Sequence, residues 1–310
     1  MKKDSPRKIL YIAGEGRSGS TILGNILGEI DGFFFVGEAV SIWRHFLMDN
    51  RMCACGVPAK ECLIWQKIFI KAFDSKSIDF SEMEHLRNIY TRNRFAWKML
   101  FPGGKEKLRQ ELAEYLRNLE SLYNAIFAIT GAEIIVDSSK RPTYAFLLGL
   151  IPNIQVYTLH LVRDSRGVAY SWGKKKIQQK SAKETVYMHQ FNPLKSAWRW
   201  NVYNFLTELL LHQPQENFLF MRYEDFIKEP TEALSKVTRL LNIASRNFPI
   251  GPHNQVNLSN SHAVWGNPCR FQNGNINLHP DEVWQQVMPQ VSKRLVTFLT
   301  RPGLRRYHYL

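Results

Sequence analysis

The sequence predicts a single α/β domain, residues 1–310, with a central parallel sheet of about five strands and helices on both faces. Short apolar segments of strand length alternate with longer segments of helical periodicity, which implies crossover connections between parallel strands. The chain of 310 residues is 45% hydrophobic, which is enough to bury a sizeable core. A glycine-rich loop directly follows the first apolar segment, as in P-loop-like nucleotide sites.

The alternation places five strands in order along the chain. They are expected at residues 9–13, 33–38, 133–139, 155–164 and 217–226. Helices are expected at residues 20–30, 105–130, 141–150, from 165, and at 193–212 and 229–243, where apolar residues recur at helical spacing. Residues 41–130 form a helical and irregular insertion on the substrate side. Residues 253–310, which are polar and rich in Asn and Gly, form a loop-rich lid and tail.

The net charge of +14 predicts an anionic ligand. The basic residues are scattered, and the one compact run is GKKK at residues 173–176, so a small polyanion is favoured over nucleic acid. No apolar run approaches the roughly 18–20 residues of a membrane span. The N-terminus also lacks an apolar stretch of signal-peptide length, which favours a cytoplasmic protein.

Three of the four cysteines cluster in the segment CACGVPAKEC, as Cys53, Cys55 and Cys62. The spacing C-x-C-x6-C is not a standard zinc spacing, and no nearby histidine completes it. A structural loop is therefore favoured, with one pair close enough to oxidise. A zinc site stays as an alternative.

The segment AGEGRSGSTILGNIL, residues 13–27, nearly matches the ATP-binding pattern G-x-x-x-x-G-K-[ST]. Ser20 stands where that pattern has its lysine, and Arg17 lies inside the loop. Backbone N–H groups between a strand and a helix bind phosphate well. The predicted phosphate-binding residues are Gly16, Arg17, Ser18, Gly19, Ser20 and Thr21. Without the lysine that reaches the γ-phosphate, the expected ligand is a nucleotide with a short 5′ group.

A second anion site is predicted in the segment LHLVRDSRGVAYSW. Arg163 ends a buried strand, and Ser171 lies about two turns into the next helix. An arginine and a hydroxyl so placed can hold a phosphate. Together with the loop, they indicate a ligand that carries phosphates at two ends. Asp164 is expected to cap the helix that follows.

These segments resemble the sulfotransferases that use 3′-phosphoadenosine 5′-phosphosulfate (PAPS). GRSGSTILGNIL resembles their 5′-phosphosulfate loop, and LHLVRDSRGVAYSW resembles their 3′-phosphate motif. VGEAVSIW lies where the R-S-G-[ST]-[ST] branch, which includes tyrosylprotein and many bacterial sulfotransferases, has a catalytic glutamate. CACGVPAKECLIW, MRYEDF and GNPCRF also resemble segments of bacterial members, so the resemblance covers nearly the whole chain.

The resemblance implies transfer of a sulfonate group from PAPS to a hydroxyl or amine, with 3′,5′-diphosphoadenosine (PAP) as the product and no metal. It implies Glu38 as the base and Arg17 at the leaving phosphate. From their positions, His45, about a turn and a half into the helix after Glu38, is a rival base, and Lys140, after the third strand, is expected to add positive charge at the sulfonate. The nucleotide residues it implies are Arg163 and Ser171 at the 3′-phosphate and Arg270 in place of the R-K-G segment of cytosolic members. Tyr223, at the end of the fifth strand, is expected at the adenine. The expected acceptor is a small molecule, with a carbohydrate or lipid-linked acceptor next.

Two other functions stay open. A P-loop kinase or NTPase would need the missing lysine and an aspartate for Mg²⁺, for which Asp137 is the candidate. A non-catalytic nucleotide-binding or nucleic-acid-binding protein would use Arg17 and Arg163 without requiring Glu38. Simpler roles also exist for single residues: Glu38 as a helix-start carboxylate, Lys140 as a surface lysine and Tyr223 in core packing.

Overall fold

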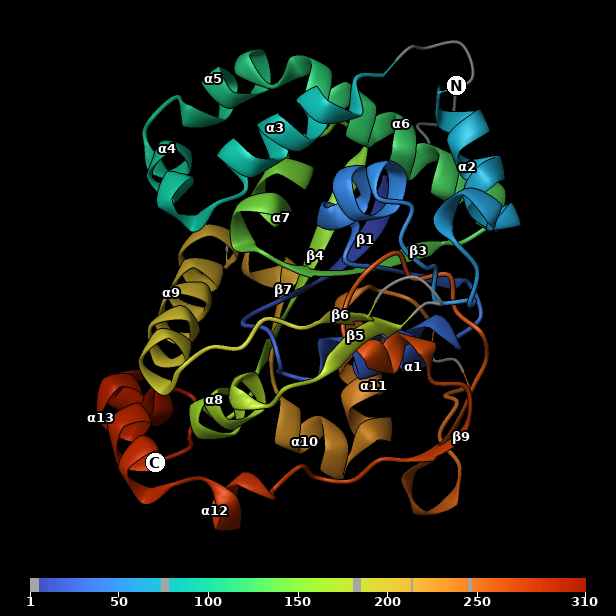
Figure 1. Cartoon of the computed structure of the whole chain (residues 1–310). Helices are drawn as coiled ribbons and strands as arrows, with labels where there is room; N and C mark the ends of the chain where they lie inside the picture. Colours follow the sequence, from blue (N-terminus) through green and yellow to red (C-terminus); the bar gives the residue numbers. More distant parts are fainter. Residues whose placement is uncertain (1–5, 74–77, 181–184, 213, 245–246) are drawn as a thin grey trace.

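The computed structural model describes residues 6–73, 78–180, 185–212, 214–244 and 247–310 (Figure 1). Its central sheet has five strands in the order β2-β3-β1-β4-β7, and each neighbouring pair is parallel. The strands are β1 (Arg7–Ala13), β2 (Phe33–Gly37), β3 (Ile134–Lys140), β4 (Ile154–Val162) and β7 (Phe218–Arg222). The predicted fold class and all five predicted strands are confirmed.

Helices cover both faces of the sheet. On β1, the side chains of Ile9, Tyr11 and Ala13 belong to one buried cluster, and those of Leu10 and Ile12 belong to another. The first cluster includes residues of α2 (Leu63–Phe73), α6 (Ala113–Thr130) and α7 (Pro142–Leu148). The second includes α1 (Ser20–Gly28), α10 (Tyr223–Lys228) and α11 (Pro230–Leu240), on the other side in Figure 1. Beside β4 and β7, α8 (Ser165–Gly173), α9 (Pro193–Leu211) and α13 (Gln290–Arg306) pack together.

The insertion between β2 and β3 is mostly helical. It begins with the short helices η1 (Ala39–Ser41) and η2 (Ile42–Met48), and η3 (Ala59–Glu61) follows the cysteine segment. Its further helices are α2, α3 (Phe80–Tyr90), η4 (Asn93–Phe95), α4 (Ala96–Leu100), α5 (Gly104–Glu111) and α6. The predicted helix at 105–130 is therefore two helices, separated at Leu112, whose ψ of 17° leaves the helical range. The leucines that recur at helical spacing over this range, from Leu108 to Leu122, are nevertheless buried.

Several elements of the second half were not predicted. Two of them are small antiparallel sheets, β5 (Ile177–Lys180) with β6 (Thr185–Tyr187) and β8 (Gln255–Leu258) with β9 (Gly274–Asn277). The others are the helices η5 (Gln215–Asn217), η6 (Pro252–Asn254), η7 (Pro268–Phe271), α12 (Trp284–Val287) and α13. The predicted strand 217–226 was too long, because β7 ends at Arg222 and Tyr223 begins α10. Among the described helices, none is long and apolar enough to cross a membrane.

The strand order determines where a ligand can bind. β1 lies in the middle of the sheet, between β3 and β4. The connection from β1 leads toward the β2 edge of the sheet, whereas the connection from β4 leads to β7 at the opposite edge. In open parallel sheets, ligands bind at the carboxyl ends of the strands where this reversal occurs. The glycine loop after β1 lies at that point.

Candidate active site

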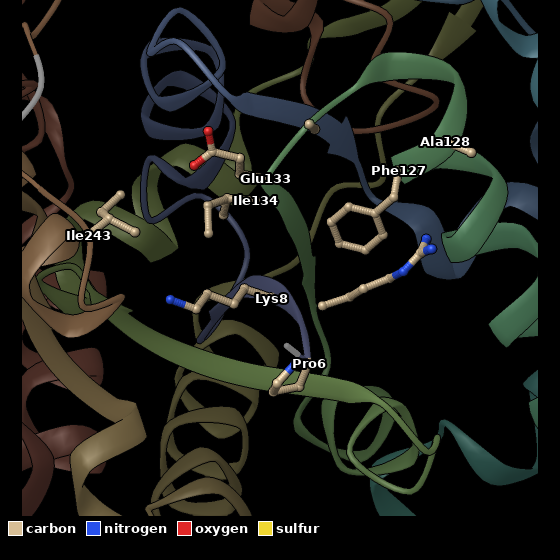
Figure 2. Close-up of a pocket in the computed structure, with 9 residues that line it drawn as sticks. Pro6, Lys8, Phe127, Ala128, Glu133, Ile134 and Ile243 are labelled. Atoms are coloured by element: carbon tan, nitrogen blue, oxygen red, sulfur yellow. The ribbon is translucent and has the colours of Figure 1, made fainter. Parts of the chain in front are cut away.

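Two cavities, each of about 420 Å³, lie at opposite edges of the sheet. Figure 2 shows the first, at the amino ends of β1 and β3, with Lys8, Phe127 and Glu133 around it. The second lies at the carboxyl ends and is bordered by the glycine loop, Glu38 and Arg163. Because the second cavity is at the strand reversal and gathers polar groups from many elements, we assign the site to it.

The second cavity is strongly cationic. Its lining side chains include seven from lysine and arginine and two carboxylates: Arg17, Arg87, Lys140, Arg141, Arg163, Lys176 and Arg199 against Glu38 and Asp281. Burial lowers the pKa of Lys176, and repulsion from Arg17 and Lys174 adds to this effect. An excess of positive charge in a concave site favours an anionic ligand. Lys176 ends the GKKK run, so one member of that run faces the cavity.

The glycine loop leads into α1, and Gly19 at the helix N-cap has a φ of 85°. Gly16, Arg17, Gly19, Ser20 and Thr21 all line the cavity. A Cβ atom at Gly19 would lie 2.4 Å from the ring of Tyr223, so only glycine fits where this ring packs on the loop. The backbone N–H groups at the start of α1 therefore border the cationic cavity, an arrangement that binds phosphate.

Arg17 is buried in the loop, with 8% of its surface exposed. Its guanidinium stacks on the Trp172 ring at 4.4 Å, and Nη1 donates to the sulfur of Met188 at 3.0 Å. Within the described residues, its Nε and Nη2 atoms have no hydrogen-bond partner. Burial lowers the pKa of Arg17, while the carboxylate of Glu38 opposes this shift. A buried guanidinium with two unused donors requires an acceptor, and an anion in the cavity supplies one.

Glu38 follows β2, and its carboxylate accepts a hydrogen bond from Lys140 Nζ at 2.6 Å. The same ammonium donates to the carbonyl oxygen of Ser138 at 2.8 Å. Both side chains line the cavity, so Lys140 is not an ordinary surface lysine. The backbone at Arg17 and Lys140 is left-handed, with φ values of 70° and 67°. Such a conformation is unusual for residues with side chains, and here it occurs at two cations of the site.

The predicted second anion site also lies in this cavity, because Arg163 and Ser171 both line it. Arg163 Nη2 donates to the Asp281 carboxylate and backbone oxygen at 3.0 Å each, and Nη1 donates to the backbone oxygen of Arg17 at 3.2 Å. The guanidinium also lies over the Tyr223 ring, 4.8 Å from its centre. Arg163 thus connects the two predicted phosphate sites, and its present anionic partner is the carboxylate of Asp281.

His45 lines the cavity from η2 and stacks on Trp265, with ring centres 4.3 Å apart. Its Nδ1 lies 3.3 Å from the Asp49 carboxylate. Burial lowers the pKa of His45, and Asp49 opposes this shift. The structure therefore leaves His45 close to the site but already engaged by two partners.

Two predicted residues, Ser18 and Arg270, do not line the cavity, although both are buried. The Ser18 hydroxyl has no partner among the described residues. Arg270 donates from Nη1 to the carbonyl oxygen of Gly266 at 3.1 Å and packs against the rings of Trp265 and Phe271. Burial lowers the pKa of Arg270 to about 10. Arg270 thus supports the wall formed by Trp265 and Gly266 from behind.

Sequence reasoning missed several lining residues. Arg199 of α9 forms two hydrogen bonds, at 2.9 and 3.3 Å, with the buried Glu15 of the glycine loop. Trp265 and Asp281 come from the tail, and Trp172 stacks on Arg17. The one available signal was Glu15, since an acidic residue in a buried glycine loop needs a cationic partner.

Asp137, the candidate Mg²⁺ ligand of an NTPase, is fully buried and outside the cavity lining. One of its carboxylate oxygens accepts from the Ser139 hydroxyl at 2.5 Å and the Ser139 N–H at 2.8 Å, and the other accepts from the Tyr123 hydroxyl at 2.6 Å. Burial raises the pKa of Asp137 to about 6. Its carboxylate serves the packing between β3 and α6. The predicted cap at Asp164 is confirmed, since its side chain accepts from the Arg166 N–H at 2.9 Å.

Comparison with known proteins identifies a family for the chain. Residues 139–294 match the family model described as the sulfotransferase domain, which includes Lys140, Arg163 and Ser171. The sulfotransferase domain from the Synechococcus PCC 7002 olefin synthase is similar in structure, with a TM-score of 0.52 at 14% identity over 96% of each chain. This similarity shows a shared fold.

Two other solved structures are also similar at lower scores. The sulfotransferase domain from the curacin biosynthetic pathway has a TM-score of 0.49 at 18% identity, covering 95% of this chain and 98% of that one. Sulfotransferase STF9 from Mycobacterium avium has a TM-score of 0.45 at 10% identity, covering 97% and 77%. No curated protein sequence gives a significant match. Because the family model covers half of the chain, the protein belongs to the sulfotransferase domain family.

Proposed function

We propose that this sulfotransferase uses PAPS as its donor and transfers the sulfonate to a hydroxyl or amine of a small molecule. The observation that carries the donor proposal is Arg17, a buried guanidinium with two unused donors beside a phosphate-binding loop that lacks the ATP-site lysine. A phosphosulfate has no γ-phosphate, so it does not need that lysine. PAPS supplies the sulfonate group and leaves as PAP.

The residues of the chain divide the work of this reaction. The loop N–H groups and Arg17 bind the 5′ phosphosulfate, and Arg17 neutralises the charge that develops on the leaving phosphate. Glu38 accepts the proton from the acceptor's nucleophile, and Lys140, 2.6 Å away, orients the carboxylate and adds positive charge near the sulfonate. Arg163 and Ser171 hold the 3′-phosphate, and Tyr223, which packs between Gly19 and Arg163, borders the nucleotide.

The acceptor side is formed by the two regions that cover the cavity. Ser41, His45 and Arg87 reach it from residues 41–130, and Trp265, Gly266 and Asn267 reach it from residues 253–310. The whole cavity, of about 420 Å³, also holds the donor in this proposal, so only part of its volume is left for the acceptor. A small acceptor fits this space better than a polymer.

The NTPase alternative loses support from Ser20 and Asp137. Ser20 leaves the loop without its lysine, and both oxygens of the Asp137 carboxylate are engaged inside the protein. The non-catalytic alternative does not explain why Glu38 and Lys140 form an ion pair inside the cavity.

Thermal unfolding with PAP, ATP–Mg²⁺ and an oligonucleotide in parallel tests the donor. A ligand at 100 times its Kd stabilises the folded state by about 2.7 kcal/mol, which shifts the midpoint measurably. We expect a shift with PAP and a much smaller one in Arg17→Ala, while Arg301→Ala on the exposed face of α13 keeps the full shift. A shift with ATP–Mg²⁺ or oligonucleotide but not with PAP would refute the proposal. A mass-spectrometric screen for sulfonated products then identifies the acceptor.

A further inference from the structure

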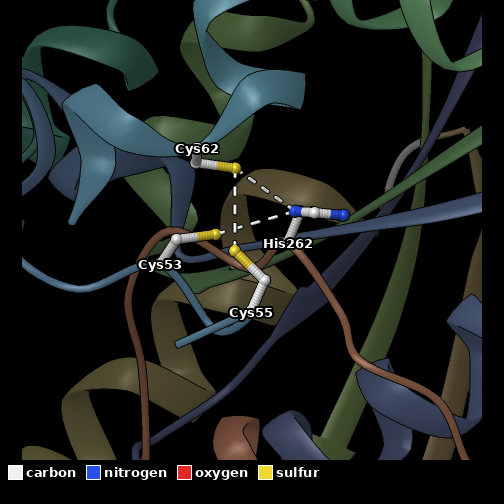
Figure 3. Close-up of side chains that lie close together, drawn as sticks. All are labelled: Cys53, Cys55, Cys62 and His262. Atoms are coloured by element: carbon white, nitrogen blue, oxygen red, sulfur yellow. Dashed lines mark hydrogen bonds between the residues drawn. The ribbon is translucent and has the colours of Figure 1, made fainter. Parts of the chain in front are cut away.

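Outside the second cavity, four metal-ligating side chains meet, three from one short segment and one from the tail. Cys53, Cys55 and Cys62 lie between η2 and α2, and His262 comes from the tail, 200 residues after Cys62. Figure 3 shows the three sulfur atoms and an imidazole nitrogen pointing toward one another. One ligand atom from each residue lies within 4.8 Å of all the others.

The spacing of these atoms matches a tetrahedral metal centre. With Zn–S bonds of about 2.3 Å and Zn–N bonds of about 2.0–2.1 Å, two sulfurs lie about 3.8 Å apart and a sulfur and a nitrogen about 3.6 Å apart. The Cys55 and Cys62 sulfurs are 3.7 Å apart, and His262 Nδ1 is 3.3 Å from the Cys62 sulfur and 3.9 Å from the Cys53 sulfur. A disulfide would require sulfurs about 2.05 Å apart. The geometry therefore fits a shared ion better than a bond between two cysteines.

The local backbone explains how the short C-x-C spacing can present two sulfurs to one point. The N–H of Cys53 donates to the Val57 oxygen at 2.8 Å, and the N–H of Gly56 donates to the Cys53 oxygen at 3.0 Å. Gly56 has a φ of 92°, which a glycine adopts at no steric cost. This tight turn brings Cys55 back beside Cys53.

We propose that Cys53, Cys55, Cys62 and His262 bind one structural zinc ion. Three thiolates and an imidazole in tetrahedral arrangement select zinc among the common divalent ions. Four protein ligands complete the coordination, so no position is left for water or substrate and the ion serves the fold. This site is separate from the sulfonate-transfer chemistry.

The ion would fasten the cysteine segment to residues 262–267, here called the tail segment. The carbonyl oxygen of His262 accepts from Trp65 Nε1 at 2.8 Å, and the N–H of Ala54 donates to the Ala263 oxygen at 3.1 Å. The tail segment continues beside β2 to Trp265 and Gly266, which line the second cavity. Zinc bound here thus fixes one wall of that cavity from outside.

The experiment measures metal in the full chain, purified without chelators and without a metal-affinity column. Mass spectrometry of the elements should find about one zinc per chain, and Cys62→Ser and His262→Ala should lose most of it. His262→Cys should retain it, because a fourth thiolate replaces the imidazole. The matched control is Cys269→Ser, whose cysteine lies outside the cluster.

Two measurements on the unaltered chain keep the proposal falsifiable if variants misfold. Cobalt substituted for zinc should give the visible absorption of tetrahedral thiolate coordination. Alkylation should modify Cys53, Cys55 and Cys62 only after a chelator removes the metal. Zinc below a tenth of an ion per chain, a Cys55–Cys62 disulfide in the purified protein, or unchanged zinc in folded His262→Ala would overturn the proposal.

Discussion

At the residue scale, the site is marked by two buried arginines, and the burial of one of them is only partly balanced by protein partners. Arg17 keeps two nitrogen atoms unpaired among the described residues, while Arg163 is held by the Asp281 carboxylate. Burying a guanidinium without enough acceptors costs free energy, so such residues persist where a ligand completes their bonds. In the proposed assignment, the two arginines lie at the two phosphate-bearing ends of the ligand. Glu38, like Arg163, has an oppositely charged partner that lines the same cavity, which for Glu38 is Lys140.

Replacing Glu38 by glutamine tests its role as the base. Glu38→Gln keeps the shape of the side chain but cannot accept the acceptor's proton, so we expect kcat to fall about 100- to 10,000-fold. The affinity for PAP, measured by calorimetry, should change by no more than a few-fold. Transfer of labelled sulfonate from PAPS to the acceptor found in the screen gives kcat.

The matched control for this change is Glu208→Gln. Glu208 is also paired with a cation, Arg306, at 2.7 Å, but it lies outside the cavity lining. Its kcat should stay close to that of the unaltered enzyme. If Glu38→Gln binds PAP and turns over normally, Glu38 has only the structural role of a carboxylate at a helix start.

Replacing Arg163 by alanine tests the 3′-phosphate site. The unaltered protein should bind PAP more tightly than AMP, which lacks the 3′-phosphate. Because hydrogen bonds between charged groups contribute about 1.5–3 kcal/mol, Arg163→Ala should reduce that preference about 10- to 100-fold. Calorimetry with both nucleotides measures the ratio of affinities. A second variant, Asp281→Asn, should tighten PAP binding, since it removes the carboxylate that occupies Arg163. An unchanged PAP-to-AMP ratio in Arg163→Ala would exclude the assignment.

At the scale of elements, the end of β2 positions Glu38, the proposed base. Gly37 has a φ of 82°, and the next residue, Glu38, donates its N–H to the Trp265 oxygen at 3.1 Å. Val264 of the tail segment donates to the Val36 oxygen at 3.0 Å. The tail segment is thus hydrogen-bonded to the free edge of β2 and to Glu38, and its residues Trp265 and Gly266 line the cavity. An element of the tail thereby sets the position of a residue near the start of the chain.

Gly37→Ala should disturb this junction. A Cβ atom there would lie 2.8 Å from the Trp265 oxygen, and a left-handed conformation costs alanine about 1–2 kcal/mol. We expect both a lower free energy of unfolding and weaker PAP binding, measured by denaturant titration and calorimetry. Gly131→Ala is the control, since Gly131 has a φ of 69° with no atom within 4 Å of the added Cβ. It should lose stability but keep its PAP affinity, and equal PAP affinity in both variants would contradict the prediction.

How far the sequence predicts these elements depends on how local their signals are. The five strands are short apolar segments followed by turns, and all were predictable. Helix α13 was not, because Val291 and Phe298 are exposed and Pro302 lies inside the helix, so its apolar pattern does not repeat cleanly. The site residues on the loops after β1, β2, β3 and β4 were predicted because parallel strands end at one edge. His262 and Asp281 were not, since their positions depend on how the tail folds back.

At the scale of the whole molecule, part of the excess of positive charge gathers around one cavity. The chain carries a net charge of +14, and seven lysine and arginine side chains line one cavity. The walls of that cavity come from the start, the middle and the end of the chain. Two buried clusters on opposite faces of the sheet hold these parts together. The site therefore forms only when the whole chain is folded.

Asp137 should lower the free energy of unfolding as the pH rises, whereas most carboxylates in folded proteins have the opposite effect. Its pKa is raised to about 6 by burial, against 3.8 ordinarily, so its contribution to stability is full below about pH 4 and is lost as pH rises through 6. Asp137→Asn removes this titration. An asparagine oxygen can still accept from Ser139, and its amide can donate to the Tyr123 hydroxyl.

Urea titrations of both proteins at pH 4.5 and pH 7.5 check this prediction. The free energy of unfolding of Asp137→Asn, relative to that of the unaltered protein, should be higher at pH 7.5 than at pH 4.5. Taking the difference between the two proteins cancels the other titrating groups. A difference that does not change with pH would mean that Asp137 has an ordinary affinity for protons in the folded state.

The left-handed backbone at Arg17 and Lys140 has a consequence for how this protein can be changed. At such φ values glycine has no steric strain, so glycine at either position would relieve backbone strain at the expense of a cation of the site. Selection or design for stability alone could therefore remove two of the seven cations that line the cavity. Mutant libraries designed to raise thermal stability should keep Arg17 and Lys140 unchanged. They should vary residues near the amino ends of the strands instead, away from the cavity.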